Sequence, residues 1–155
     1  MIQNDFIDYI SATKAAIRAY TDMEYNCSAL DAVATAVDND MIHPPGGGYS
    51  DTPTHGGGNR TEEAWCRGID QKDLLRDKLA KARAYMTWFK PAWDRLTEEE
   101  KIVLEEHYMH QRLAGSWLYS VQKRLESSNL PMERTKIYQV NERALERLSV
   151  LLFGL

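Results

Sequence analysis

The sequence predicts an all-α protein in which a long N-terminal antiparallel helical hairpin is followed by a three-helix helix-turn-helix domain. Apolar residues recur every three or four positions over long stretches, a spacing that places them on one face of a helix. No segment alternates apolar and polar residues for long enough to indicate a strand. Thr97 followed by Glu100 forms a capping box, which marks the start of another helix after the hairpin.

The hairpin is expected to occupy residues 1–95. Its first helix covers about residues 2–38 and its second about residues 62–95, and antiparallel packing would bury the apolar stripes of both. The stripes consist of Phe6, Ile10, Thr13, Ile17, Tyr20, Met23, Cys27, Leu30, Ala34 and Val37 in the first helix, and of Trp65, Ile69, Lys72, Leu75, Leu79, Ala82, Met86, Phe89 and Trp93 in the second. Pro91 removes a helical hydrogen bond and clashes with the preceding turn, so a kink or break is expected at residues 89–92.

The segment at residues 43–60 joins these two helices. It contains two glycine triplets and three of the chain's five prolines, a composition typical of a linker without a fixed conformation. A phosphate-binding loop would need a Lys-Ser or Lys-Thr pair after the glycines, and an oxyanion-hole motif would need a G-x-S-x-G nucleophile elbow. Neither is present, so we expect a linker and keep a binding loop as the alternative.

Residues 96–155 are expected to form the helix-turn-helix domain. Its first helix runs from about residue 98 to residue 110, and Gly115 marks the turn before a short helix in the segment "SWLYSVQKRLES". The last helix starts near Pro131, a residue that the first turn of a helix tolerates. A compact turn between the second and third helices is typical of a unit whose third helix enters a DNA major groove.

The outward face of the last helix has side chains suited to reading DNA. Arg and Lys can contact phosphates or guanine edges, and Gln or Asn can pair with an adenine edge. The positions expected to face outward are Arg134, Thr135, Lys136, Tyr138, Gln139, Asn141, Glu142 and Arg143. Tyr138 could contact DNA or a protein partner. Lys123 and Arg124 on the preceding helix could bind phosphate or simply face solvent.

The composition gives little support to other classes of protein. The net charge is -4, although residues 120–147 contain six basic and four acidic residues, and the two cysteines suit a reducing cytosol. We predict no catalytic residues, no metal and no cofactor, because His107 and His110 have no evident third ligand and no nucleophile is paired with a base.

The four tryptophans are expected to pack mainly in the core. Without a signal sequence or a membrane-spanning run, the protein is expected to be soluble and cytoplasmic.

The C-terminal half resembles the ArpU/RinA-like phage transcriptional activators, whose last domain is similar to region four of bacterial sigma factors. The likeness is carried by "LTEEEKIVLEEHYM" and by "RTKIYQVNERALERLSVLLFG", above all by residues 137–140 and 143–145, and "THGGGNRTEEAW" extends it into the hairpin. The resemblance implies a promoter-binding helix-turn-helix. By position, its DNA contacts would be Arg134, Thr135, Lys136, Tyr138, Gln139 and Arg143.

We therefore expect a phage-type transcriptional regulator that binds promoter DNA through its helix-turn-helix and activates late genes in a bacterial host. The expected partners are double-stranded DNA, further copies of the same chain and, as the resemblance suggests, RNA polymerase. No membrane partner is expected. The alternative is a non-enzymatic helical structural or adaptor protein that oligomerises through the N-terminal hairpin and does not touch DNA.

Overall fold

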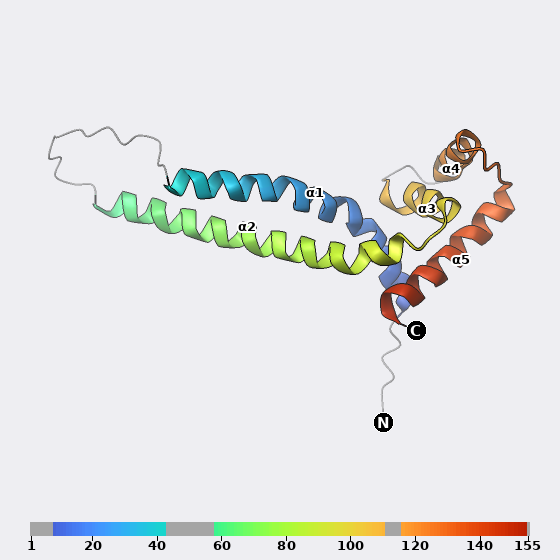
Figure 1. The fold of residues 1–155 in the computed structure, drawn as a ribbon, viewed down its shortest axis with the longest axis horizontal. Helices are drawn as coiled ribbons and strands as arrows, with labels where there is room; N and C mark the ends of the chain where they lie inside the picture. The colour runs from blue at the N-terminus through green and yellow to red at the C-terminus, as the bar shows by residue number, and fades with distance from the viewer. Residues whose placement is uncertain (1–7, 43–57, 111–115, 155) are drawn as a thin grey trace, which may run out of the picture. The chain divides into compact units, whose positions relative to one another are not determined.

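The described part of the chain is entirely helical, which confirms the predicted all-α class (Figure 1). The structure is a computed structural model that describes residues 8–42, 58–110 and 116–154. Its elements are α1 (Tyr9–Ile42), α2 (Gly58–Trp93), α3 (Glu98–Leu104), a π-helix (Glu105–Met109), α4 (Ser116–Ser127) and α5 (Arg134–Phe153). The linker predicted at residues 43–60 lies mostly outside the described residues, as does the turn predicted at Gly115.

The helix boundaries follow local capping chemistry. The Asp8 carboxylate accepts hydrogen bonds from the Ser11 N–H (3.0 Å) and from the Ser11 hydroxyl (2.6 Å) just before α1 begins. α4 spans the predicted segment from its first residue to its last. α5 begins at Arg134, three residues after Pro131, and ends at Phe153. Gly154 caps it, with a left-handed backbone (φ 70°) that suits a residue without a Cβ.

α2 is continuous through the break predicted at residues 89–92. It contains Pro91 and ends at Trp93. After it the chain tightens, since the N–H groups of Arg95 and Leu96 donate to carbonyls three residues back, at 3.2 and 3.1 Å. Because Pro91 lies in the last turn of α2, most of the helix keeps its hydrogen-bond ladder.

The residues group into two compact units. One contains the residues up to Asp22 and those from Tyr85 onward, and the other is Met23–Ala84. This grouping divides both long helices, whereas the boundary predicted from the sequence falls after residue 95. Within Met23–Ala84 the two helical segments lie side by side and run in opposite directions (Figure 1). An exposed ion pair joins them there, between Arg83 Nη2 and Asp31 Oδ1 at 2.8 Å.

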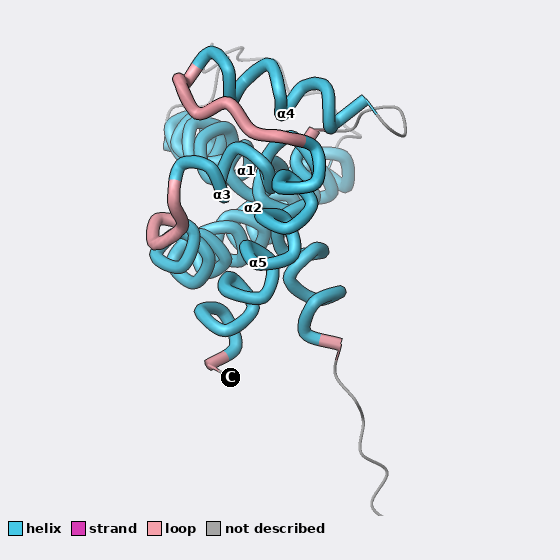
Figure 2. The backbone as a smooth tube through the Cα atoms, turned by 90° about the vertical axis from the view of Figure 1, so that its right-hand side faces the viewer, coloured by secondary structure: helices cyan, strands magenta, loops and turns pink. Residues whose placement is uncertain are grey.

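The larger unit has two apolar clusters, and α5 packs against both. The first half of α5 contributes Ile137 and Val140 to a cluster with Ile102, Val103, Leu118, Val121 and Leu125. Its second half contributes Ala144, Leu145, Leu148 and Leu152 to a cluster with Ala16, Ile17, Phe89, Ala92, Trp93, Leu96, Leu104 and Tyr108. In this unit α3 lies between α4 and α5 (Figure 2). α5 is therefore held along its length by residues from every other helical element of the unit.

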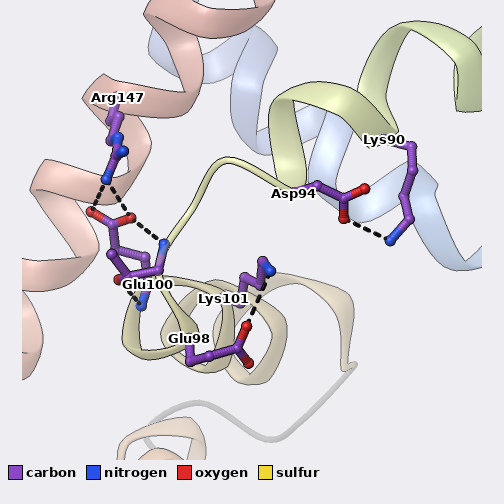
Figure 3. Close-up of polar contacts among 7 residues, drawn as sticks. Lys90, Asp94, Glu98, Glu100, Lys101 and Arg147 are labelled. Carbon is purple, nitrogen blue, oxygen red and sulfur yellow. Dashed lines mark hydrogen bonds and ion pairs between the residues drawn. The ribbon is translucent and has the colours of Figure 1, made fainter.

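The predicted capping box is present at the start of α3 (Figure 3). Thr97 Oγ1 accepts from the Glu100 N–H at 3.3 Å, and Glu100 Oε2 accepts from the Thr97 N–H at 2.9 Å. The Glu100 side chain is buried, and Arg147 Nη1 of α5 approaches its two oxygens at 3.1 and 3.4 Å. One carboxylate thus both caps α3 and binds α5.

No helix among the described residues has an apolar stretch that could cross a bilayer.

The capping box provides a stability prediction. Thr97→Ala removes one capping hydrogen bond and should lower the free energy of unfolding by about 1 kcal/mol. Glu100→Ala removes the reciprocal cap and also the partner of Arg147, so its cost should be larger, about 2 kcal/mol. Urea unfolding followed by circular dichroism measures both. Glu99→Ala, in the same first turn but outside the box, is the matched control, and an equal loss in Glu99→Ala and Glu100→Ala would contradict the assignment.

Candidate nucleic-acid interface

The first half of α5 presents most of the predicted DNA-contacting residues to solvent. Its buried apolar residues, Ile137 and Val140, are three positions apart and Ala144 follows four residues later, so most of the intervening side chains point outward. The exposed side chains are those of Arg134, Thr135, Lys136, Tyr138, Gln139, Glu142 and Arg143. The structure therefore brings the six α5 residues of the predicted site onto one exposed helical segment.

Asn141 departs from the prediction, because it was expected to face outward and is only 8% exposed. It lies four residues after Ile137 and four before Leu145, within the buried face of α5. Its amide is nevertheless satisfied. Oδ1 lies 3.0 Å from His107 Nδ1, and Nδ2 donates to the Tyr108 hydroxyl at 3.4 Å.

The predicted contacts on α4 have different surroundings. Lys123 is exposed, and its Nζ lies 5.2 Å from the ring centroid of Tyr119, which is itself exposed. Arg124 Nη1 lies 2.5 Å from Glu105 Oε2 and 3.3 Å from Glu106 Oε1. Burial alone would lower the pKa of Arg124, but the two carboxylates outweigh it and raise the pKa. Arg124 therefore joins α4 to the π-helix.

A column of stacked rings extends from the exposed face of α5 into the unit. The Tyr138 ring meets Trp117 edge to face, with centroids 5.6 Å apart. Trp117 stacks on His107 at 3.8 Å with an interplanar angle of 5°, and His107 stacks on Tyr108 at 4.0 Å. Arg18 of α1 lies over the Tyr108 ring at 5.7 Å. Tyr138 is 51% exposed, yet aromatic contact with Trp117 orients its ring.

The tryptophans fit the core prediction only in part. Trp93 is buried in the cluster formed with Phe89, as predicted, and Trp117 is half-buried. Trp88 is 41% exposed, so the core prediction is wrong for it, although its Nε1 donates to the Leu152 carbonyl at 3.2 Å. The side chain of Trp65 lies outside the described residues.

His107 connects this column to the hydrogen bonds of Asn141. Because Asn141 Oδ1 can only accept a hydrogen bond, His107 Nδ1 must carry the proton that it donates to this oxygen. Burial lowers the pKa of His107, and the positive charges of Lys14 and Arg18 add to this, against the effect of the Asn141 hydrogen bond. The imidazole is therefore held in its neutral form near pH 7.

A polar pocket of about 470 Å³ gives solvent access to this histidine. It is lined by Arg18, Thr21 and Asp22 of α1 and by residues 107–110. Within the described ranges, no three His, Cys, Asp or Glu side chains come close enough to hold a metal ion. The pocket thus lets a proton reach His107.

Comparison of the chain with protein-family models, with curated proteins and with solved structures gave no match.

The lowered pKa of His107 predicts an acid-sensitive contribution to stability. The unfolded chain takes up this proton near pH 6.5 and the folded chain only at lower pH, so stability is complete above about pH 6.5 and falls as the pH drops towards the folded pKa. In an NMR titration, the ring proton resonance that His107→Gln removes should have a midpoint below about 6.5. His107→Gln should also lose less stability than the wild type on acidification. A midpoint above the ordinary value would contradict the cause assigned here.

Proposed function

We propose that this protein is a phage-type transcriptional regulator that binds promoter DNA through the exposed face of α5 and activates late genes. The observation that carries the proposal is the two-sided character of α5. One side is buried in two apolar clusters, and the other presents Arg134, Thr135, Lys136, Tyr138, Gln139 and Arg143. A helix anchored in this way can present base-contacting side chains in a fixed register.

The proposed chemistry divides these residues by role. Arg134 and Lys136 lie in the first turn of α5 and would contact phosphates. The Glu133 side chain does not cap the first N–H groups of α5, so these groups could also bind a phosphate. Gln139 and Arg143, one turn apart, would read base edges. The ring of Tyr138, oriented by Trp117, would contact a thymine methyl group or the sugar-phosphate backbone.

α4 would contribute phosphate contacts next to this face. Lys123 is exposed, and its ammonium group over the Tyr119 ring can turn to a phosphate at small cost. Arg124 Nη1 lies 2.5 Å from Glu105 Oε2, so Arg124 could bind a phosphate only by giving up this ion pair. The greater share of the proposed phosphate binding on α4 therefore falls to Lys123.

The regulatory part of the proposal rests on the resemblance to proteins with a sigma-region-four-like domain. That likeness favours promoter DNA as the target and RNA polymerase as a second partner. It also supports assembly of several copies of the chain, for which the helical pair at residues 23–84 offers a long surface.

A second candidate function is that of a structural or adaptor protein that oligomerises through the helical pair. The observation that favours it is the exposure of Tyr25, Val33 and Leu74 within Met23–Ala84. This candidate needs no contact between α5 and DNA. Sedimentation equilibrium of the full chain, with and without a Val33→Asp plus Leu74→Asp variant, would detect such assembly.

DNA binding can be tested with duplex fragments tiled across the neighbouring genome, at two salt concentrations and with competitor DNA. We expect one fragment to be retained in competitor and released as salt rises. Lys136→Ala should weaken binding to all sequences and reduce the salt slope by about 1, while Gln139→Ala should reduce discrimination at one base pair by roughly 1–3 kcal/mol.

The matched control is Lys78→Ala plus Gln71→Ala, which removes the same two side-chain types from exposed positions on α2. This control should bind the retained fragment as tightly as the wild type. If folded wild-type protein retains no fragment, the DNA-binding proposal is wrong and the adaptor function becomes the favoured one.

A further inference from the structure

His107 contacts both helices of the proposed DNA-binding pair, although it belongs to neither. Towards α4, its imidazole stacks flat on the Trp117 indole, with centroids 3.8 Å apart and the planes within 5°. Towards α5, its Nδ1 donates to Asn141 Oδ1 at 3.0 Å. A single side chain thus connects the two helices through a stacking contact and a directional hydrogen bond.

The π-helix is what makes this double contact possible. Glu105–Met109 widens the backbone directly after α3, and consecutive residues of it reach different neighbours. Glu105 and Glu106 bind Arg124 of α4, whereas His107 and Tyr108 meet the Asn141 amide of α5. The π-helix directly follows α3, which lies between α4 and α5 (Figure 2). Its residues can therefore contact α4 and α5 at the same time.

The connection reaches the exposed DNA face through one further ring. Trp117, stacked on His107, also meets the Tyr138 ring edge to face at 5.6 Å. A shift of the imidazole would therefore move the indole, and with it the support of an exposed side chain of the proposed site. Asn141 is three residues after Tyr138, less than one helical turn away. The hydrogen bond between His107 and Asn141 therefore fixes the rotation of α5 about its axis close to Tyr138.

We propose that His107 is a positioning residue for DNA recognition, which sets the placement of α4 against α5 and so the alignment of Lys123 with the outward face of α5. This inference rests on the proposed DNA-binding function. It assigns His107 no contact with DNA.

The test separates positioning from ordinary core packing by means of two variants. His107→Phe keeps a ring beside Trp117 but leaves the buried Asn141 oxygen without its donor, which should lower stability. Adding Asn141→Leu replaces the second polar partner with an apolar group of similar size, so stability should recover towards that of the wild type. The hydrogen bond between His107 Nδ1 and Asn141 Oδ1 is absent from both variants, and the bond from Asn141 Nδ2 to the Tyr108 hydroxyl is absent from the double variant alone.

The deciding measurement is the affinity of the double variant for the specific duplex compared with competitor DNA. If His107 positions the helices, specific binding should stay about tenfold weaker than in the wild type, with competitor binding unchanged, although stability has recovered. Specific binding that recovers together with stability would show a structural role alone and overturn the inference.

A second measurement needs no DNA, and it distinguishes failure of this inference from failure of the proposed function. Spin labels at Glu126→Cys on α4 and Glu146→Cys on α5, both exposed, report the distance between the helices after Cys27 and Cys66 are replaced by serine. We expect the distance distribution to shift or broaden in the double variant and in His107→Gln. An unchanged distribution overturns the inference even where the wild type binds DNA. A changed distribution supports the placement of α4 against α5 by His107, and if no duplex is bound it is the proposed DNA-binding function, not this placement, that has failed.

Discussion

The buried face of α5 is the constraint on which the larger unit depends. Twenty residues of helix rise about 30 Å, and apolar side chains follow one face of it from Ile137 to Leu152. The first turns pack with residues of α3 and α4, and the later turns pack with Phe89 and Trp93 of α2 and with Ile17 of α1. Because an α-helix is stiff over this length, the packing of α5 in one cluster also sets its orientation in the other. The outward face of α5 is fixed by the same packing.

Polar groups at the edges of this packing specify its register. Apolar contacts tolerate small rotations and slides, whereas a buried carboxylate or amide loses most of its stabilisation when its partner moves. Asn141 lies where the α5 residues of one cluster give way to those of the other, between Val140 and Ala144. Glu100 fixes the same helix six residues further on, through Arg147. Together they hold the rotation of α5 relative to α3 and the π-helix.

Much of the fold follows from the sequence because helix periodicity and capping are local signals. The bounds of α4, the capping box at Thr97 and the exposure of Arg134 and Lys136 all follow from spacing within a few residues. Long-range pairing has no such signal. Nothing within reach of His107 in the sequence indicates Asn141, 34 residues away, and the polar type of Asn141 concealed its place on the buried spacing. The exposure of Trp88 and the pairing of Arg124 were hidden for the same reason, since both depend on which elements meet in space.

The charge distribution explains why orientation matters so much to the proposed function. Residues 120–147 contain six basic and four acidic side chains, but Arg124 and Arg147 are paired with carboxylates of the π-helix and α3. Glu142 and Glu146 are exposed on α5 itself. Such a surface attracts phosphate weakly, so non-specific binding would be poor and specific binding would depend on base contacts made in exact alignment. A protein with so little electrostatic attraction for phosphate would gain more from a fixed angle between the two helices proposed to face DNA than a strongly basic protein would.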